Sequence, residues 1–256
     1  MRSTETEGVP RTALKLVGRN PLTRLRRELP LWGSIIAALA LATPALAHNI
    51  GGSDAAFVAA TRGPDPIPFA YLGAKHMVTG YDHLLFLLGV IFFLFRLRQI
   101  ALYVSLFSLG HSITLLAGVF FDLHVDPHLV DAVIGLSVAY KAFDNLGGFT
   151  TLFKVQPDPR AAVFGFGLIH GFGLATKLQA LNLNREGLLV NLVSFNVGVE
   201  IGQVVALSLI LVAMTLWRRT RAFEPTAQGA NVLLMLAGFV LAGQQIAGYV
   251  FGGAVS

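Results

Sequence analysis

Ligand-type side chains recur inside the apolar stretches of this sequence. His76 and His83 stand seven residues apart, with Asp82 beside the second of them. Two turns of a helix would place both imidazoles on one face. Three further apolar stretches each contribute one such side chain, namely His111, His170 and Glu200. An ionisable group inside a membrane costs at least a few kcal/mol, so we expect the set to converge rather than to face lipid.

These side chains limit the kinds of metal site and metal ion that are possible. The chain contains no cysteine, which excludes thiolate metal sites, disulfides and cysteine nucleophiles. Neutral imidazoles with one or two carboxylates suit a borderline divalent ion such as nickel, zinc, cobalt, copper or iron, and suit calcium and magnesium poorly. The sequence therefore predicts a metal site formed by His76, Asp82, His83, His111, His170 and Glu200.

Asp82 has a different expected role from the histidines. It cannot share the helix face of the adjacent His83, so we expect it to fix the tautomer of an imidazole on a neighbouring helix. A single intramembrane histidine can also serve only as a hydrogen-bond partner between helices, and this alternative stays open for each histidine taken alone.

A second group of His and Asp lies between two apolar stretches. Residues 122–128 read DLHVDPH, so two histidines and two aspartates fall within seven residues. Such a cluster could collect a metal ion at the mouth of a membrane bundle through His124, Asp126 and His128. A plain solvated loop is the alternative.

The elements that must position these residues are membrane helices. The 256 residues are 54% hydrophobic and 13% charged, and a soluble domain carries about 25% charged residues. Each of six apolar stretches is long enough to span a bilayer, and no ten-residue alternation typical of a barrel is present. We expect spans at residues 74–95, 99–121, 129–149, 161–181, 187–217 and 229–252.

The N-terminus resembles an export signal. Seven basic residues precede an apolar stretch that ends in Ala45-Leu46-Ala47, the small-x-small pattern read by signal peptidase. We predict a signal peptide at 1–47, a short exported segment at 48–73 without a strong fold of its own, and a transmembrane domain at 74–256. The fold class is therefore an all-α bundle of six transmembrane helices, or seven if the signal is not cleaved.

Basic residues predict the orientation of this bundle. Eight lie in or beside the loops after the first, third and fifth spans, and four lie at the other end. The positive-inside rule then puts both mature termini outside the cytoplasm. The basic residues occur in short clusters between apolar runs, so they indicate topology rather than a nucleic-acid surface, and no Gly-x-x-x-x-Gly-Lys-Ser/Thr motif for a nucleotide occurs.

Smaller motifs in the spans indicate helix packing. Four glycines flank His170 and would leave one helix face almost bare for close approach of a neighbour, namely Gly165, Gly167, Gly171 and Gly173. Lys141 and Asp144 are three residues apart and predict an internal ion pair. The pairs Phe92-Phe93 and Phe120-Phe121 are expected to face lipid or the interface.

Several of these segments resemble one known family. The run from His76 to Leu87, HMVTGYDHLLFL, is similar to the signature opening of the HupE/UreJ family, bacterial membrane proteins associated with nickel supply to hydrogenase and urease. Further segments resemble its second subgroup in the same order: LGHSITL at 109–115, IGLS at 134–137 with DNL at 144–146, FGFGLIHGFG at 164–173 and FNVGVEIGQ at 195–203.

This resemblance implies a multispan protein of the bacterial inner membrane, in some members a secondary nickel permease. Its first signature ties transport to the residues that match His76, Asp82 and His83 here. The resemblance thus places nickel first among the candidate ions, ahead of zinc, cobalt, copper and iron. It also implies metalloenzyme maturation proteins as partners, besides the lipid bilayer and the metal ion as substrate.

Three functions fit this sequence. The first is a permease or metal-handling protein whose ion crosses through the histidine site. The second is a zinc-dependent intramembrane hydrolase in which three histidines hold the metal and Asp82 or Glu200 acts as general base. The third is a protein that presents metal to a partner. We favour transport over catalysis.

Overall fold

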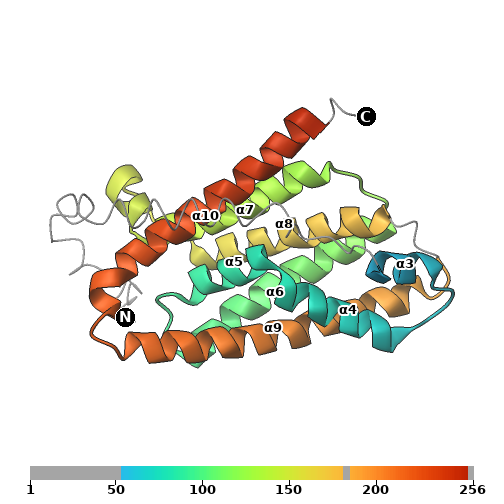
Figure 1. The fold of residues 1–256 in the computed structure, drawn as a ribbon, viewed down its shortest axis with the longest axis horizontal. Coiled ribbons are helices and arrows are strands. Elements are labelled where there is room, and N and C mark those ends of the chain that lie inside the picture. Colours follow the sequence, from blue (N-terminus) through green and yellow to red (C-terminus); the bar gives the residue numbers. More distant parts are fainter. Residues whose placement is uncertain (1–52, 181–184, 253–256) are drawn as a thin grey trace, which may run out of the picture. The chain divides into compact units, whose positions relative to one another are not determined.

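The computed structural model describes residues 53–180 and 185–252. The predicted signal peptide at 1–47 lies outside these residues. The described residues form helices and no strand (Figure 1). In chain order the helices are α3 Ser53–Ala60, α4 Pro66–Thr79, α5 Tyr81–Ile91, α6 Leu97–Phe120, α7 Pro127–Asn145, the π-helical turn η1 Phe149–Phe153, α8 Pro159–Gln179, α9 Leu188–Arg218 and α10 Phe223–Gly252.

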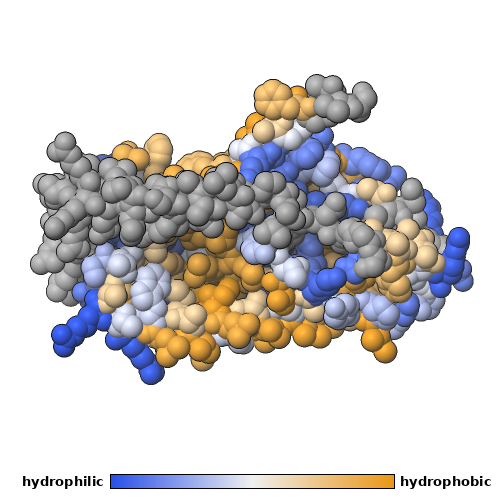
Figure 2. Space-filling view, in the orientation of Figure 1, coloured by the Kyte–Doolittle hydropathy of each residue, from blue (hydrophilic) through white to orange (hydrophobic). Residues whose placement is uncertain are grey.

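Four of these helices are long and apolar enough to cross a membrane, namely α6, α8, α9 and α10. The two other predicted spans correspond to the α4–α5 segment and to α7. Many of the large hydrophobic side chains are exposed, as in Val193, Val197, Ile201 and Val204 along one side of α9. Figure 2 shows apolar residues gathered over the part of the visible face where α9 lies. An apolar surface of this kind suits contact with lipid.

The helices associate mainly in three pairs: α6 with α8, α7 with α10, and α4 with α9. Helix α5 contacts members of all three pairs, which makes it the central element (Figure 1). Each pair meets at glycines. A Cβ at Gly171 would collide with the carbonyl of His111, one at Gly198 with the carbonyl of Ala70, and one at Gly238 with the backbone of Ala139. Small residues are what allow such close backbone approach.

The four glycines around His170 do not share one face, which corrects the expectation from the sequence. Gly167 and Gly171 lie against the backbone of α6, whereas Gly173 lies against side chains of α7 and Gly165 borders open space. The reason is the helical period: residues four apart share a face, but residues two apart do not. Only the Gly-x-x-x-Gly part of the run therefore brings α8 close to α6.

The first predicted span is broken, so its description as one helix at 74–95 is wrong. Helix α4 begins earlier, at Pro66, and ends at Thr79. Gly80 takes an extended conformation, with φ −74° and ψ 99°, and α5 begins at Tyr81. Helix α3 and the start of α4 also occupy part of the exported segment, for which no strong fold was expected. The break places two helix ends beside His76 and His83.

Side chains hold the far end of α5. Asn145 from α7 donates to the carbonyl of Gly89 at 2.8 Å, and Arg218 from α9 donates to the carbonyls of Ile91 at 2.6 Å and Phe92 at 2.7 Å. The last carbonyls of a helix lack partners within the helix, so cationic or amide donors there stabilise its end. We call the end of the bundle that carries the loops after α5, α7 and α9 the basic end.

Candidate metal site

Three imidazoles gather around that of His83 in the interior of the bundle. The ring centroid of His83 lies 5.2 Å from that of His76, 5.0 Å from that of His170 and 6.0 Å from that of His111. The four rings come from α4, α5, α6 and α8. The glycine contact between α6 and α8 brings His111 and His170 close together, because small residues let two backbones approach. The break at Gly80 leaves His76 in the last turn of α4 and His83 in the first turn of α5. We call these four residues the histidine cluster.

Burial differs among the members of the histidine cluster. His111 and His170 are 1% exposed and His83 is 3% exposed, whereas His76 is only partly buried. His170 places Nδ1 2.7 Å from the carbonyl oxygen of Phe166. Neither ring nitrogen of His111 has a hydrogen-bond partner among the described residues. Buried polar atoms are nearly always paired in native proteins, so His111 is chemically suited to a ligand.

Asp82 contacts its own neighbour, which corrects the expectation that it serves an imidazole on another helix. One oxygen, Oδ1, lies 2.8 Å from Nδ1 of His83 and 2.6 Å from the backbone nitrogen of the same residue. This geometry is possible because Asp82 stands in the first turn of α5, where backbone N–H groups have no partner within the helix. A carboxylate only accepts, so Nδ1 donates and Nε2 keeps the lone pair that could bind a metal.

Glu200 lies apart from this arrangement. It is exposed on α9, among apolar side chains such as Val197 and Ile201. Gln203 of the same helix is buried instead, at 0% exposed, and accepts a hydrogen bond from Ser108 of α6 at 2.6 Å. The interior of the bundle thus receives an amide from α9, three residues after the expected carboxylate.

Phenylalanines enclose the histidine cluster, and sequence reasoning missed them. Phe107 lies 4.9 Å from His170 and Phe86 lies 5.3 Å from the same ring, measured between centroids. Phe195 of α9 lies 6.0 Å from His76. The available signal was spacing, since Phe86 and Phe107 stand three or four residues from a histidine of the same helix.

The family match covers the helices that carry this geometry. The pattern of the family described as HupE / UreJ protein matches residues 52–252. The chain belongs to the HupE/UreJ family. No curated protein and no solved structure gave a match. The matched range includes the helix break, the histidine cluster and every helix from α3 to α10.

The histidine cluster of this HupE/UreJ chain is not a finished coordination sphere. Within residues 53–180 and 185–252, no group of three or more His, Cys, Asp or Glu side chains is arranged to hold one metal ion. The rings are in contact, and their donor atoms would have to move to share an ion. This distinguishes the cluster from a structural metal site, in which rigid ligands already stand in coordination geometry.

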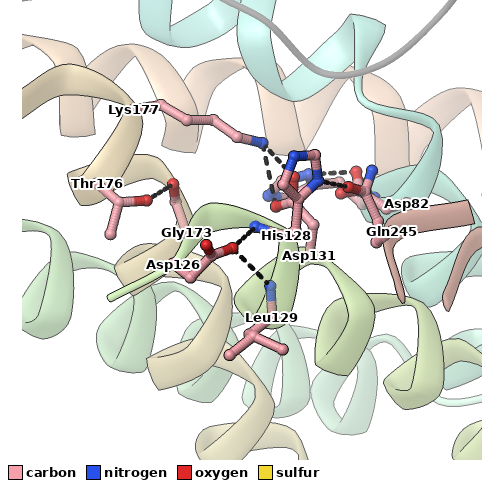
Figure 3. A network of polar contacts seen from close by, with 10 residues as sticks. Asp82, Asp126, His128, Leu129, Asp131, Gly173, Thr176, Lys177 and Gln245 are labelled. Carbon is pink, nitrogen blue, oxygen red and sulfur yellow. Dashed lines mark hydrogen bonds and ion pairs between the residues drawn. The ribbon is translucent and has the colours of Figure 1, made fainter. Parts of the chain in front are cut away.

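The second predicted group lies in the loop at 121–126 and in the first turn of α7, and its residues have separate partners. Asp126 caps α7 by accepting from the backbone nitrogens of His128 at 2.8 Å and Leu129 at 3.4 Å. Nδ1 of His128 lies 2.9 Å from Oε1 of Gln245, as Figure 3 shows. His124 is exposed and places Nδ1 2.9 Å from the carbonyl oxygen of Asp122. The side chains of this loop therefore do not meet as one group.

Two ion pairs within the helical bundle lie near opposite ends of α7. Lys141 and Asp144 form the predicted pair, with Nζ and Oδ2 2.6 Å apart. Lys177 of α8 pairs with Asp131 of α7 at 2.8 Å, which sequence reasoning missed (Figure 3). The second pair joins different helices, so no spacing rule along one helix could have indicated it.

The two pairs of adjacent phenylalanines differ in their exposure. Phe120 and Phe121 are exposed, as expected, at 47% and 75%. Phe92 is 1% exposed and packs against Trp217 and Phe223, so its assignment to a lipid-facing or interfacial position is wrong. The reason is the short loop after α5, which folds Phe92 beneath the turn between α9 and α10.

Proposed function

We propose that this protein is a permease for a divalent transition metal, with nickel first and zinc, cobalt, copper or iron as alternatives. The single observation that carries the proposal is the histidine cluster, above all His111, whose two ring nitrogens are buried and have no hydrogen-bond partner among the described residues. Membership of the HupE/UreJ family supports metal handling. The proposed binding residues are His76, Asp82, His83, His111 and His170. Glu200 is exposed, so we omit it from this inner set.

The unfinished coordination sphere favours a transported ion over a resident one. Conduction requires binding that is strong enough to admit an ion and weak enough to release it. A cluster whose donors must move to meet satisfies this requirement better than a rigid four-ligand site. The helix break at Gly80 supports the same function, because many transporters form their substrate sites from discontinuous helices.

The proposed orientation of the bundle follows from the positive-inside rule. If the basic end faces the cytoplasm, then both mature termini lie outside, and the exposed side chains of His124, Asp126 and His128 lie at the outer mouth of the bundle. There they would attract a cation before it reaches the partly buried His76. Protonation of the imidazoles offers a coupling mechanism, because a histidine releases a metal as it gains a proton.

Metal content and flux, measured together, test this proposal. The purified protein is assayed for nickel, zinc, cobalt, copper and iron, and then for metal uptake into liposomes, as wild type and as His83→Ala. We expect saturable flux for one of these ions and its loss in the variant. Ser137→Ala is the matched control, because Ser137 is equally buried but bonds only within α7.

The alternative functions give different results in the same assay. Bound zinc at one ion per chain without flux would contradict transport and favour the intramembrane hydrolase or a metal-presenting protein. No bound metal and no flux for any of the five ions would leave the histidines as hydrogen-bonding groups between helices and would contradict the proposal as a whole.

A further inference from the structure

A phenylalanine follows three of the four histidines toward the basic end. On α5, which runs toward that end, Phe86 comes three residues after His83. On α6 and α8, which run away from it, a phenylalanine comes four residues before the histidine, in the pairs Phe107 with His111 and Phe166 with His170. At a rise of 1.5 Å per residue, each ring is displaced by roughly 4.5–6 Å toward the basic end.

Phe86 contacts both of the other phenylalanines. Ring centroids of Phe86 and Phe107 lie 5.2 Å apart, and those of Phe86 and Phe166 lie 5.8 Å apart. Phe86 is 0% exposed and Phe107 is 1% exposed. Tyr140 of α7 lies 5.1 Å from Phe166 and supports it from behind. We call Phe86, Phe107 and Phe166 the phenylalanine layer.

Polar groups occur again between the phenylalanine layer and the basic end. One turn beyond Phe86, the carbonyl of Gly89 accepts a hydrogen bond from Asn145, and Asn145 also donates to Asn231 at 3.0 Å. The ion pair of Lys141 and Asp144 lies on the same stretch of α7. A single apolar layer thus separates the histidine cluster from a polar group at the basic end.

We propose that the phenylalanine layer is the inner gate of this permease. A hydrophobic constriction excludes a hydrated ion by dewetting, so the histidine cluster would be closed toward the basic end in this conformation. The layer opens only if α5 moves relative to α6 and α8, because each helix contributes one ring. The break at Gly80 supplies a hinge at one end of α5. This inference rests on the proposed function for its transport role, but the barrier itself can be tested without any metal.

Thiol labelling measures the barrier directly, because the chain has no cysteine of its own. His111→Cys places a reporter next to Phe107, whose ring lies 6.4 Å from that of His111. A cationic, membrane-impermeant methanethiosulfonate is added to inverted vesicles, which expose the basic end if it is cytoplasmic, and to spheroplasts, which expose the other face. Labelling in detergent after unfolding gives the total number of reactive thiols.

The variants Phe86→Ala and Phe107→Ala are each combined with this reporter. Removal of one ring leaves an opening in the apolar layer, so we expect labelling from the basic end to accelerate by about tenfold or more. Phe86→Leu keeps an apolar side chain in place and should stay closed. Phe92→Ala is the matched control, because Phe92 is equally buried but lies outside the layer. In this variant the thiol reporter should be labelled at the same rate as in a protein whose phenylalanine layer is intact.

Each labelling result either supports or overturns the proposed gate. Unchanged labelling in folded Phe86→Ala and Phe107→Ala would overturn the gate, as would equal acceleration in Phe92→Ala. If the two alanine variants fail to elute as the native protein, Phe166→Ala takes their place, because Phe166 is only partly buried and its loss costs less packing. Accelerated labelling, together with no metal flux in the wild-type protein, would support the barrier and contradict the permease, so the two proposals fail separately.

Discussion

The histidine cluster and the loop at 121–126 contain the same kinds of side chain, but they differ in what those side chains contact. In the cluster, His83 is buried and touches three other imidazoles. In and beside the loop, Asp126 caps a helix and His128 contacts Gln245, each in an exposed position. Exposed groups satisfy their polar atoms with water, whereas buried groups must find one another or a ligand. Burial, rather than residue type, separates a candidate site from a loop.

The largest expected effect comes from the centre of the cluster. His83→Ala removes the one ring that contacts all three others, so we expect metal flux to fall by at least about 100-fold, the upper limit for loss of an outer partner of a metal ligand. Uptake into liposomes measures it. Flux within twofold of wild type, in a protein that elutes normally, would place the ion path elsewhere.

A smaller effect is expected from substitution of Asp82, the residue that orients the His83 ring. Asp82→Asn keeps the shape but replaces the accepting carboxylate by a neutral amide, so the tautomer of His83 is held less firmly. We expect roughly 10–100-fold weaker metal binding, measured by calorimetry or equilibrium dialysis. The exposed Glu200→Gln serves as the carboxylate control and should change affinity by much less. A greater loss at Glu200 would show that α9 contributes to the site directly.

The glycine contact that positions two of the rings should affect stability. Gly171→Ala forces a methyl group against the carbonyl of His111, and overpacking of this kind costs roughly 1–3 kcal/mol. Gly165→Ala is the matched control on the same helix, because its Cβ meets open space. Thermal unfolding in detergent compares the two. Equal thermal unfolding midpoints for Gly171→Ala and Gly165→Ala would mean that α6 and α8 do not approach as closely as described.

The smallest effects are expected in the loop. Asp126→Ala removes the cap of α7 and should cost about 1 kcal/mol of stability without abolishing flux. His124→Ala should lower flux by less than about threefold at saturating metal, because loss of rim charge changes the rate of encounter more than the bound state. Flux assays at low and saturating metal concentrations separate these effects. Abolished flux in His124→Ala would make the loop as important as the cluster.

Hydrophobic patterning predicted most helix positions well. The expected spans at 99–121 and 161–181 correspond to α6 at Leu97–Phe120 and α8 at Pro159–Gln179. Apolar length determines where a chain crosses a bilayer, and Pro159 in the first turn marks a helix start. The break at Gly80 could not be predicted in the same way, because an isolated glycine is tolerated inside membrane helices.

The candidate site could be predicted as a set of residue types but not as a set of contacts. The sequence predicted that His83, His111 and His170 converge, and in the structure the His83 ring contacts the other two. The predicted set also included Glu200, which is exposed, whereas Gln203, three residues further along the same helix, is buried. Depth depends only on position along a helix, whereas the direction of a side chain also depends on how the helix is rotated against its neighbours.

The amino-acid sequence by itself determined that this chain belongs in a membrane, that its candidate ligands are imidazoles and carboxylates, and that it belongs to the HupE/UreJ family. Only the tertiary structure decided which of those ligands meet, where the first span breaks, and that three phenylalanines from α5, α6 and α8 close into one layer. The physical reason is that apolar composition acts on each segment separately, whereas ring contacts require the positions and rotations of several helices at once.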